Sequence, residues 1–267
     1  MSSTVTSATP SIVAAVRAQS PLVQYLTNYV SMDVAANVLN AVGASPAMVH
    51  DPHESGEFAR IASAVGVNIG TPSPSWVDGM IEAARAAHEV GTPWVLDPVA
   101  VGATAYRREI VAQLLEHRPT VVRGNASEIL AIATSQTGGR GVDSDAASSD
   151  AVDAARGLAR DLATVVVVTG VEDVVTDGSR TAVVHGGHAW MPMVTALGCS
   201  ATALVAACCA VEPDALEASV AAMVMLAVAG ERAGERSAGP GSFRVALLDE
   251  LAALDDVRVA SARVVRS

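Results

Sequence analysis

Aromatic side chains are scarce in this chain: Phe, Trp and Tyr together make up 3% of its 267 residues. The aromatic platforms on which proteins stack single-stranded nucleic acid are therefore missing. Basic residues are also few, since 17 Lys and Arg stand against 28 Asp and Glu and the formal net charge is −11. They form no basic stripe, which argues against a nucleic-acid surface and favours a small-molecule partner.

Cysteine is nearly absent. The three that occur, Cys199, Cys208 and Cys209, have an odd count and no C-x-x-C spacing, so neither a disulfide framework nor a zinc knuckle is indicated. Residues 1–10 contain no charged segment followed by an apolar block, and no secretory signal is expected. These absences predict a protein of a reducing, cytoplasmic compartment.

Long hydrophobic runs are missing as well. Residues 201–211 and 220–230 are the longest, about half of the roughly 20 residues that cross a bilayer, so we expect buried helices and no membrane partner. An apolar content of 51% in 267 residues is enough for one sizeable core. We expect a single domain, residues 1–267, with flexible tails at residues 1–9 and 255–267.

Short β-branched runs alternate with Ala-rich stretches of helical period, which is the pattern of βα units around a parallel sheet. The clearest strand ends are Val67-Asn68-Ile69-Gly70-Thr71, Val95-Leu96-Asp97-Pro98, Val121-Val122-Arg123-Gly124-Asn125 and Val165-Val166-Val167-Val168-Thr169-Gly170. Ligands of open α/β sheets bind beyond the carboxyl ends of the strands. We therefore predict an α/β fold of three layers, α-β-α, with its active site along these strand ends.

The pattern changes after the last of these strands. Residues 174–184 contain two β-runs around Asp177-Gly178, which predicts an antiparallel hairpin at the edge of an otherwise mostly parallel sheet. Residues 198–254 are expected to form helices that cover the sheet. Residues 135–150 are polar and contain glycine, and we expect a surface loop there.

Gly198 and Cys199 directly precede an apolar helical run. The first N–H groups of such a helix have no intrahelical partner and carry the positive end of the helix dipole, so this turn predicts an anion site. The same position is expected to depress the pKa of the Cys199 thiol. Cys208 and Cys209 fall inside the run and are expected in the core.

Three charged residues follow predicted strands. Asp97 and Glu128 offer hard oxygen ligands of the kind that hold Mg²⁺ at phosphoryl-transfer sites, largely through water. The alternatives are a turn-stabilising Asp97 and an N-cap Asn125 with Glu128 in a capping box. Arg123 lies between them in sequence, beside a glycine that permits close approach of a ligand, and a guanidinium binds phosphate oxygens well. Thr169 adds a hydroxyl at the next strand end.

Assembled, these segments resemble hydroxyethylthiazole kinase, a family of the ribokinase-like superfamily. The matching motifs run in family order from residue 21 to residue 254: Leu26-Thr27-Asn28-Tyr29-Val30, Gly43-Ala44-Ser45-Pro46-Ala47-Met48, Asn68-Ile69-Gly70-Thr71, Leu96-Asp97-Pro98-Val99, Arg123-Gly124-Asn125-Ala126-Ser127-Glu128, Val168-Thr169-Gly170, Gly198-Cys199 and Gly239-Pro240-Gly241-Ser242-Phe243. Any one motif is weak, but the combination is specific.

The resemblance implies a ribokinase-like fold and transfer of the ATP γ-phosphoryl group to the hydroxyl of 4-methyl-5-(2-hydroxyethyl)thiazole. It implies ATP contacts at Arg123, Thr169 and Asn125, and a Mg²⁺ site at Asp97 and Glu128. The thiazole is expected at Met48 and Ala196, with Asn28, Gly70, Thr71 and Val99 nearby. Gly198 and Cys199 are implied as the anion hole, with Cys199 where most superfamily kinases carry an Asp base. Family members are typically homotrimers with sites between subunits.

One motif departs from the family. Gly-Thr-Gly-Cys is usual, whereas this chain has Ala196-Leu197-Gly198-Cys199. If the first position has φ > 0, Ala there is strained by roughly 1 kcal/mol. This departure leaves two alternatives open: a related kinase of another small alcohol, such as a hydroxymethylpyrimidine or pyridoxal, and a non-catalytic thiazole-binding protein.

Overall fold

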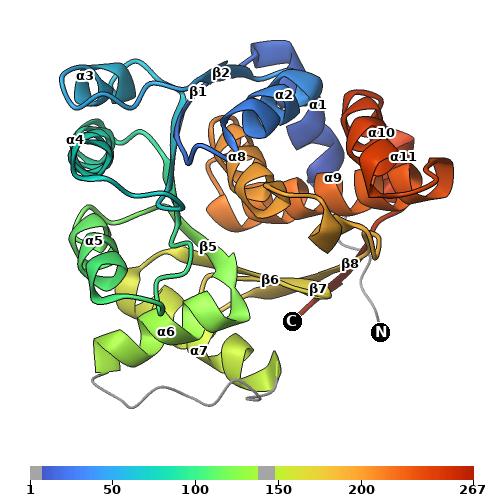
Figure 1. The fold of residues 1–267 in the computed structure, drawn as a ribbon. Helices are drawn as coiled ribbons and strands as arrows, with labels where there is room; N and C mark the ends of the chain where they lie inside the picture. The colour runs from blue at the N-terminus through green and yellow to red at the C-terminus, as the bar shows by residue number, and fades with distance from the viewer. Residues whose placement is uncertain (1–7, 138–147) are drawn as a thin grey trace.

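A single mixed sheet organises the molecule (Figure 1). The computed structural model describes residues 8–137 and 148–267, in which nine strands follow the order β2-β1-β3-β4-β5-β6-β7-β8-β9. Strands β1 to β6 pair in parallel and β6 to β9 pair antiparallel, so the mostly parallel sheet is confirmed. Their bounds are β1 (Leu22–Leu26), β2 (Ser45–Ala47), β3 (Ala64–Asn68), β4 (Trp94–Asp97), β5 (Val121–Asn125), β6 (Val165–Thr169), β7 (Glu172–Thr176), β8 (Thr181–His185) and β9 (Arg263–Arg266).

Helices cover both faces of the sheet, which confirms the three-layer architecture (Figure 1). One face carries α3 (Ser55–Ala59), α4 (Pro74–Val90), α5 (Ala105–Leu115), α6 (Ala126–Thr137) and α7 (Ser148–Leu162). The other carries α1 (Thr9–Gln19), α2 (Met32–Val42), α8 (Leu197–Cys209), α9 (Ala215–Arg236) and α10 (Pro240–Ala252). A 3₁₀ turn (Met191–Met193) precedes α8. The loop expected at residues 135–150 lies mostly outside the described residues, and its first part continues α6.

Each face of the sheet has its own hydrophobic core. Successive residues of a strand point to opposite faces, and in β6 Val165 and Val167 pack beneath α8 and α9 while Val166 and Val168 pack toward α4 to α7. A strand buried on both sides must be apolar throughout. This is why β6 appears in the sequence as an unbroken run of four valines.

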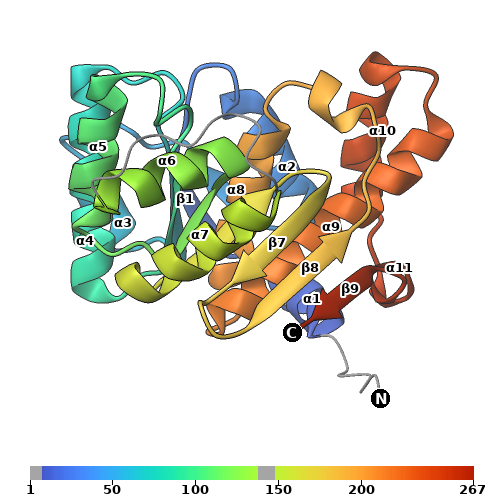
Figure 2. The same cartoon turned by 90° about the horizontal axis from the view of Figure 1, so that it is seen from below.

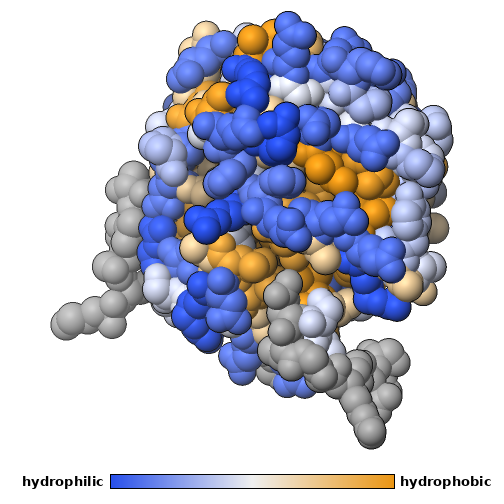
Figure 3. All heavy atoms as spheres, turned by 90° about the vertical axis from the view of Figure 1, so that its left-hand side faces the viewer, coloured by the Kyte–Doolittle hydropathy of each residue, from blue (hydrophilic) through white to orange (hydrophobic). Residues whose placement is uncertain are grey.

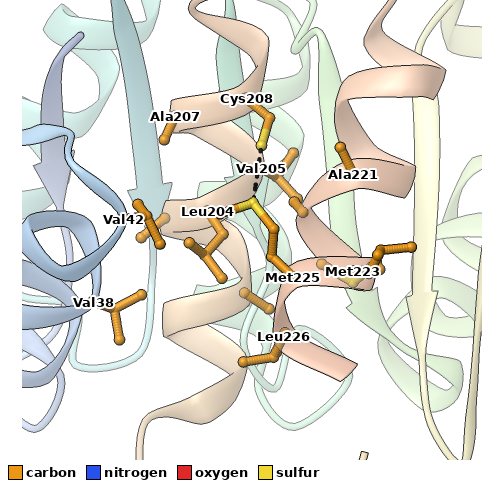
Figure 4. Packing of buried hydrophobic residues seen from close by; sticks show 14 of the residues in the cluster. Val38, Val42, Leu204, Val205, Ala207, Cys208, Ala221, Met223, Met225 and Leu226 are labelled. Carbon is orange, nitrogen blue, oxygen red and sulfur yellow. Dashed lines mark hydrogen bonds between the residues drawn. The ribbon is translucent and has the colours of Figure 1, made fainter. Parts of the chain in front are cut away.

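Helix α8 lies in the larger core, and every residue from Ser200 to Cys209 is buried. Cys208 and Cys209 are core residues as predicted, and Cys208 Sγ lies 3.9 Å from Met225 Sδ of α9 (Figure 4). Burial raises the pKa of Cys209 to about 12, so its thiol stays protonated. Within the described ranges, no helix combines the length and apolar character needed to span a membrane.

The C-terminal segment corrects one expectation. Residues 255–267 do not form a flexible tail but α11 (Asp256–Ala260) and β9, which pairs antiparallel with β8. Thr181 N donates to Ser267 O at 2.8 Å, and Ser267 N donates back to Thr181 O at 2.9 Å. The predicted hairpin β7–β8 exists, but β9 is the outermost strand (Figure 2). At the other end Thr9 already begins α1, and residues 1–7 lie outside the described residues.

Candidate active site

Polar side chains gather at the carboxyl ends of strands β3 to β6. Asn68 ends β3 in register with Asp97 of β4, and Asn125 ends β5 in register with Thr169 of β6. The N-terminal turn of α8 reaches the same edge, because Thr202 Oγ1 donates to Asp97 Oδ2 at 2.8 Å. The fold thus brings together residues that are far apart in the sequence, at the edge where α/β sheets bind ligands.

The first turn of α8 supplies unpaired backbone donors. Its first intrahelical hydrogen bond runs from Ser200 N to Ala196 O at 2.9 Å. The N–H groups of Leu197, Gly198 and Cys199 therefore have no carbonyl of their own helix to donate to, and the helix dipole adds positive charge there. This geometry is that of the anion site expected at Gly198 and Cys199.

Ala196, which precedes α8, adopts a left-handed conformation with φ 68° and ψ 9°. In this region the Cβ of an L-residue crowds the following carbonyl oxygen, and only glycine enters it without cost. The position where the family has glycine thus does have positive φ in this chain. Ala196 keeps the backbone path of the turn at a cost of about 1 kcal/mol.

The Arg123 guanidinium lies against this turn. A Cβ added to Gly198 would lie 2.9 Å from Arg123 Nη1 and 3.2 Å from Nη2, so a larger residue there would displace the guanidinium. Arg123 is 8% exposed and its Nη2 donates to Thr169 Oγ1, while its buried Nε finds no hydrogen-bond partner in residues 8–137 and 148–267. A guanidinium and a helix N-terminus repel each other unless an anion lies between them. The arrangement therefore favours a phosphate at this corner.

Asp97 is almost fully enclosed, with 1% of its surface exposed. Its Oδ2 accepts hydrogen bonds from Asn68 Nδ2 at 2.6 Å and from Thr202, and lies 3.5 Å from Arg123 Nη1. Burial raises the pKa of Asp97, and the Arg123 charge opposes that shift. Its Oδ1 is buried and has no hydrogen-bond partner among the described residues. A buried carboxylate oxygen that accepts no hydrogen bond costs free energy, and a bound cation or water molecule would remove that cost.

The Asn68 side chain makes hydrogen bonds to four residues of the site, each from a different segment of the chain. Its Oδ1 accepts from Asn28 Nδ2 at 2.8 Å and from Gly70 N at 2.9 Å. Its Nδ2 donates to Asp97 and, at 3.3 Å, to Cys199 Sγ. Asn28 Nδ2 also donates to Cys199 Sγ at 3.3 Å. Two amide donors thus fix the sulfur as an acceptor, beside the carboxylate.

The Cys199 thiol does not have the depressed pKa expected at a helix N-terminus. Burial raises the pKa of Cys199, and the Asp97 carboxylate raises it further, while hydrogen bonds to Ser31 and Asn28 oppose the shift. The expectation was wrong because the dipole was the only factor visible in the sequence, whereas the fold encloses the sulfur beside a negative charge. The thiol is therefore protonated at neutral pH.

Glu128 and Asn125 form the capping box that was considered as an alternative. Asn125 Oδ1 accepts from Glu128 N at 2.9 Å, and Glu128 Oε2 accepts from Asn125 N at 2.8 Å. Glu128 Oε1 also accepts from Ala100 N at 2.9 Å, which ties α6 to the loop after β4. Burial raises the pKa of Glu128, and these two backbone donors oppose the shift. Each oxygen keeps a second lone pair, so water on a cation could still donate to it.

The donor set fits a hydrated magnesium ion better than a protein-caged metal. No group of three or more His, Cys, Asp or Glu side chains that could hold a metal occurs among the residues described. Magnesium is commonly bound through one or two carboxylates, waters and substrate phosphates. The unpartnered Oδ1 of Asp97 and the free lone pairs of Glu128 match that pattern.

The residues expected around the thiazole follow strands β1, β2, β3 and β4, except Ala196, which precedes α8. Gly70 packs against Asn28, since a Cβ on Gly70 would lie 2.5 Å from Asn28 Nδ2. Thr71 Oγ1 accepts from Tyr29 N at 3.3 Å. Val99 lies on the loop after β4, and Met48 follows β2 and packs against the core on the α8 side. Asn28 thus joins the loop that carries Gly70 to Cys199, beside the corner formed by Arg123 and the first turn of α8.

Three residues of this region were not among the expected site residues: Asn68, Thr202 and Arg107. Asn68 ends an apolar strand just as Asp97 does, and Thr202 follows Cys199 by one helical turn, so both have a sequence signal. Arg107 has none. Its guanidinium donates to main-chain carbonyls of two loops. Every residue has such a carbonyl, so these partners cannot be recognised from residue types.

Comparison with known proteins gives concordant matches. The model of the hydroxyethylthiazole kinase family matches residues 13–256. A hydroxyethylthiazole kinase of Rhizobium rhizogenes is 55% identical over 257 residues, which cover 96% of each chain. One of Cereibacter sphaeroides is 57% identical over 238 residues, covering 89% of this chain and 90% of the relative.

Solved structures agree. The hydroxyethylthiazole kinase of Pyrococcus horikoshii superposes with a TM-score of 0.91 at 37% identity, covering 97% of this chain and 98% of that one. A pyridoxal kinase of Bacillus subtilis, in complex with ADP, gives a TM-score of 0.59 at 18% identity, covering 78% of this chain and 91% of that chain. The second match shows a shared fold alone and confirms the ribokinase-like architecture.

Proposed function

The chain belongs to the hydroxyethylthiazole kinase family, and from that premise we propose that it transfers the γ-phosphoryl group of ATP to the hydroxyl of 4-methyl-5-(2-hydroxyethyl)thiazole. The observation that carries the proposal is the phosphate corner, where Arg123 packs on Gly198 against the first turn of α8. Phosphoryl transfer passes through a loose transition state whose charge must be neutralised by positioned donors. A guanidinium and unpaired amides supply that neutralisation in an otherwise acidic molecule.

For the nucleotide, we propose that Arg123, Thr169 and Asn125 contact the ATP phosphates. Arg123 is held by its bond to Thr169 Oγ1, so its planar fork faces the corner without a large loss of rotamer freedom on binding. Asn125 lies in register with Thr169 on the adjacent strand. Gly198 and Cys199 contribute their backbone N–H groups.

For the metal, we propose that Asp97 and Glu128 hold Mg²⁺, mainly through its water ligands. When bound, Mg²⁺ would neutralise charge on the phosphate oxygens. The support is the orphaned, buried Oδ1 of Asp97 and the free lone pairs on Glu128. Burial raises the pKa of Asp97 although the Arg123 charge and the hydrogen bonds from Thr202 and Asn68 oppose the shift, and a bound cation would oppose it further.

For the acceptor, we propose that the thiazole lies beside Asn28, Gly70, Thr71 and Val99, with Met48 and Ala196 completing the pocket. The protonated Cys199 thiol accepts from two amides and positions the substrate hydroxyl at the γ-phosphoryl group. It is too weak a base to remove the hydroxyl proton at the outset. A loose transition state depends more on positioning than on base strength, and the hydroxyl proton passes late to an oxygen of the transferred phosphoryl group.

The test is an ADP-release assay with purified protein, ATP and Mg²⁺ over a panel of alcohols: hydroxyethylthiazole, a hydroxymethylpyrimidine and pyridoxal. We expect the highest kcat/KM with hydroxyethylthiazole. Higher kcat/KM for another alcohol would identify a related kinase. Tight thiazole binding without ADP release would identify a non-catalytic binding protein and overturn the proposal.

We also propose a cytoplasmic homotrimer with active sites between subunits. An apolar area lies on the face formed by α3, α4 and α5 (Figure 3), and exposed apolar patches commonly mark subunit contacts. The free thiols of Cys199, Cys208 and Cys209 suit a reducing compartment. Light scattering should give three times the chain mass of 27.1 kDa, and a single-chain mass would refute the trimer.

A further inference from the structure

Arg107 of α5 binds two loops of the acceptor side at once. Its Nη1 donates to Ile69 O and to Val99 O, both at 2.8 Å, and its Nη2 donates to Gly70 O at 2.8 Å. Ile69 and Gly70 belong to the loop after β3, and Val99 belongs to the loop after β4. In the described part of the chain no carboxylate pairs with Arg107, so its charge is directed at these three carbonyls.

One backbone hydrogen bond links the start of the β3–α4 loop to the end of β4, from Ile69 N to Asp97 O at 3.3 Å. The β3–α4 loop is held from the opposite side, where Gly70 N donates to Asn68 Oδ1 and Thr71 Oγ1 accepts from Tyr29 N. The β4–α5 loop is held by Glu128, which accepts from the N–H of Ala100. Ala100 has φ 54°, a strained conformation that persists only when its neighbours are fixed. Arg107 spans the space between the loops with three side-chain hydrogen bonds.

We propose that Arg107 is a positioning residue that sets the separation of the two loops and thereby the acceptor specificity of the site. This inference rests on the proposed function, because it takes Gly70, Thr71 and Val99 as the acceptor wall. A guanidinium has the fixed fork needed to bridge three carbonyls, and the charge strengthens each bond. Arg107 touches no reacting group, so its loss should weaken binding of the alcohol and change the rate of the transfer step less.

The chain offers a matched control in the adjacent residue. Arg108 also lies on α5 and also donates to a carbonyl of the β4–α5 loop, from Nη1 to Gly102 O at 3.1 Å. It is exposed and binds one loop only. Arg108→Met therefore removes the same charge from the same helix and leaves the bridge between the loops intact.

The experiment compares R107M, R107K and R108M with the parent protein. KM for hydroxyethylthiazole and for ATP is measured separately, together with the ratio of kcat/KM for hydroxyethylthiazole to that for the bulkier hydroxymethylpyrimidine. For R107M we expect a roughly tenfold rise in the thiazole KM, the factor that corresponds to 1.4 kcal/mol. We expect an ATP KM within about threefold of the parent and a lower selectivity ratio. R107K should have a thiazole KM and a selectivity ratio between those of R107M and the parent, and R108M should match the parent in both.

The outcomes separate this inference from the proposed function. A parent protein that does not phosphorylate the thiazole refutes the proposed function. An active parent with an unchanged thiazole KM and selectivity in R107M refutes the inference alone, as does an equal change in both KM values and kcat. If R107M does not fold, R107K decides, because a lysine keeps the charge but lacks the fork: a selectivity ratio equal to that of the parent overturns the inference.

Discussion

Replacing Ala196 by glycine should stabilise the protein. Ala196 has φ 68°, where an L-residue pays about 1–2 kcal/mol relative to the right-handed region. Glycine removes that strain but makes the unfolded chain more flexible, at a cost of about 0.4–1 kcal/mol. The difference predicts a gain of about 0–1.6 kcal/mol in the free energy of unfolding, with a midpoint of about 0.8 kcal/mol.

The assay is urea unfolding followed by circular dichroism, which measures a difference of this size better than heating does. In a chain of 267 residues 1 kcal/mol moves Tm by only about 2 °C. Ala112→Gly is the matched control, since Ala112 is exposed in the middle of α5 and glycine there should cost about 1 kcal/mol. An A196G variant as destabilised as A112G would refute the reasoning, because the left-handed conformation would then carry no strain.

Four further predictions concern the phosphate corner. Gly198→Ala places a methyl group against Arg123 and should raise the ATP KM by roughly tenfold; an unchanged KM would mean that the guanidinium does not contact the nucleotide. Glu128→Gln should raise the Mg²⁺ concentration needed for half-maximal rate and destabilise the fold by about 1–3 kcal/mol, because one backbone donor loses its acceptor; unchanged magnesium dependence would remove Glu128 from the metal role. Cys199→Ala should lower kcat by about 10²-fold without abolishing transfer, and complete loss in a folded variant would make the thiol indispensable. Because burial raises the pKa of Cys199, mass spectrometry should find slow alkylation by iodoacetamide at pH 8 and faster alkylation as pH rises, whereas rapid reaction at pH 7 would contradict the raised pKa.

The ends of the strands could be predicted from the sequence because burial on both faces of a parallel sheet restricts which residues a strand can contain. A strand covered on both faces must be apolar, and the first polar residue after it marks the ligand edge. Asp97, Asn125 and Thr169 end their strands as that rule expects, Arg123 lies two residues before the end of β5, and the structure brings all four to one edge. The helix start at Gly198 was likewise visible, since the apolar run begins directly after it.

Other features depend on partners that the sequence does not identify. Arg107 binds carbonyl oxygens, which every residue possesses, and the bonded carbonyls of Ile69 and Gly70 lie on a loop more than thirty residues away. The raised pKa of Cys199 arises from enclosure beside Asp97, which only the folded chain creates. The strand β9, Arg263-Val264-Val265-Arg266, is too short and lacks the alternation of a half-buried strand, and its partner β8 lies far upstream.

That last strand has a practical consequence for handling the protein. β9 covers the hydrogen-bonding edge of β8, and its terminal arginines contact acidic residues of α9: Arg266 pairs with Glu217, and Arg263 lies near Glu231. Charged residues on an outer strand discourage edge-to-edge pairing with other molecules. A truncation that removes the final six residues would bare an apolar strand as a template for aggregation. Affinity tags are therefore better attached to the beginning of the chain than to its end.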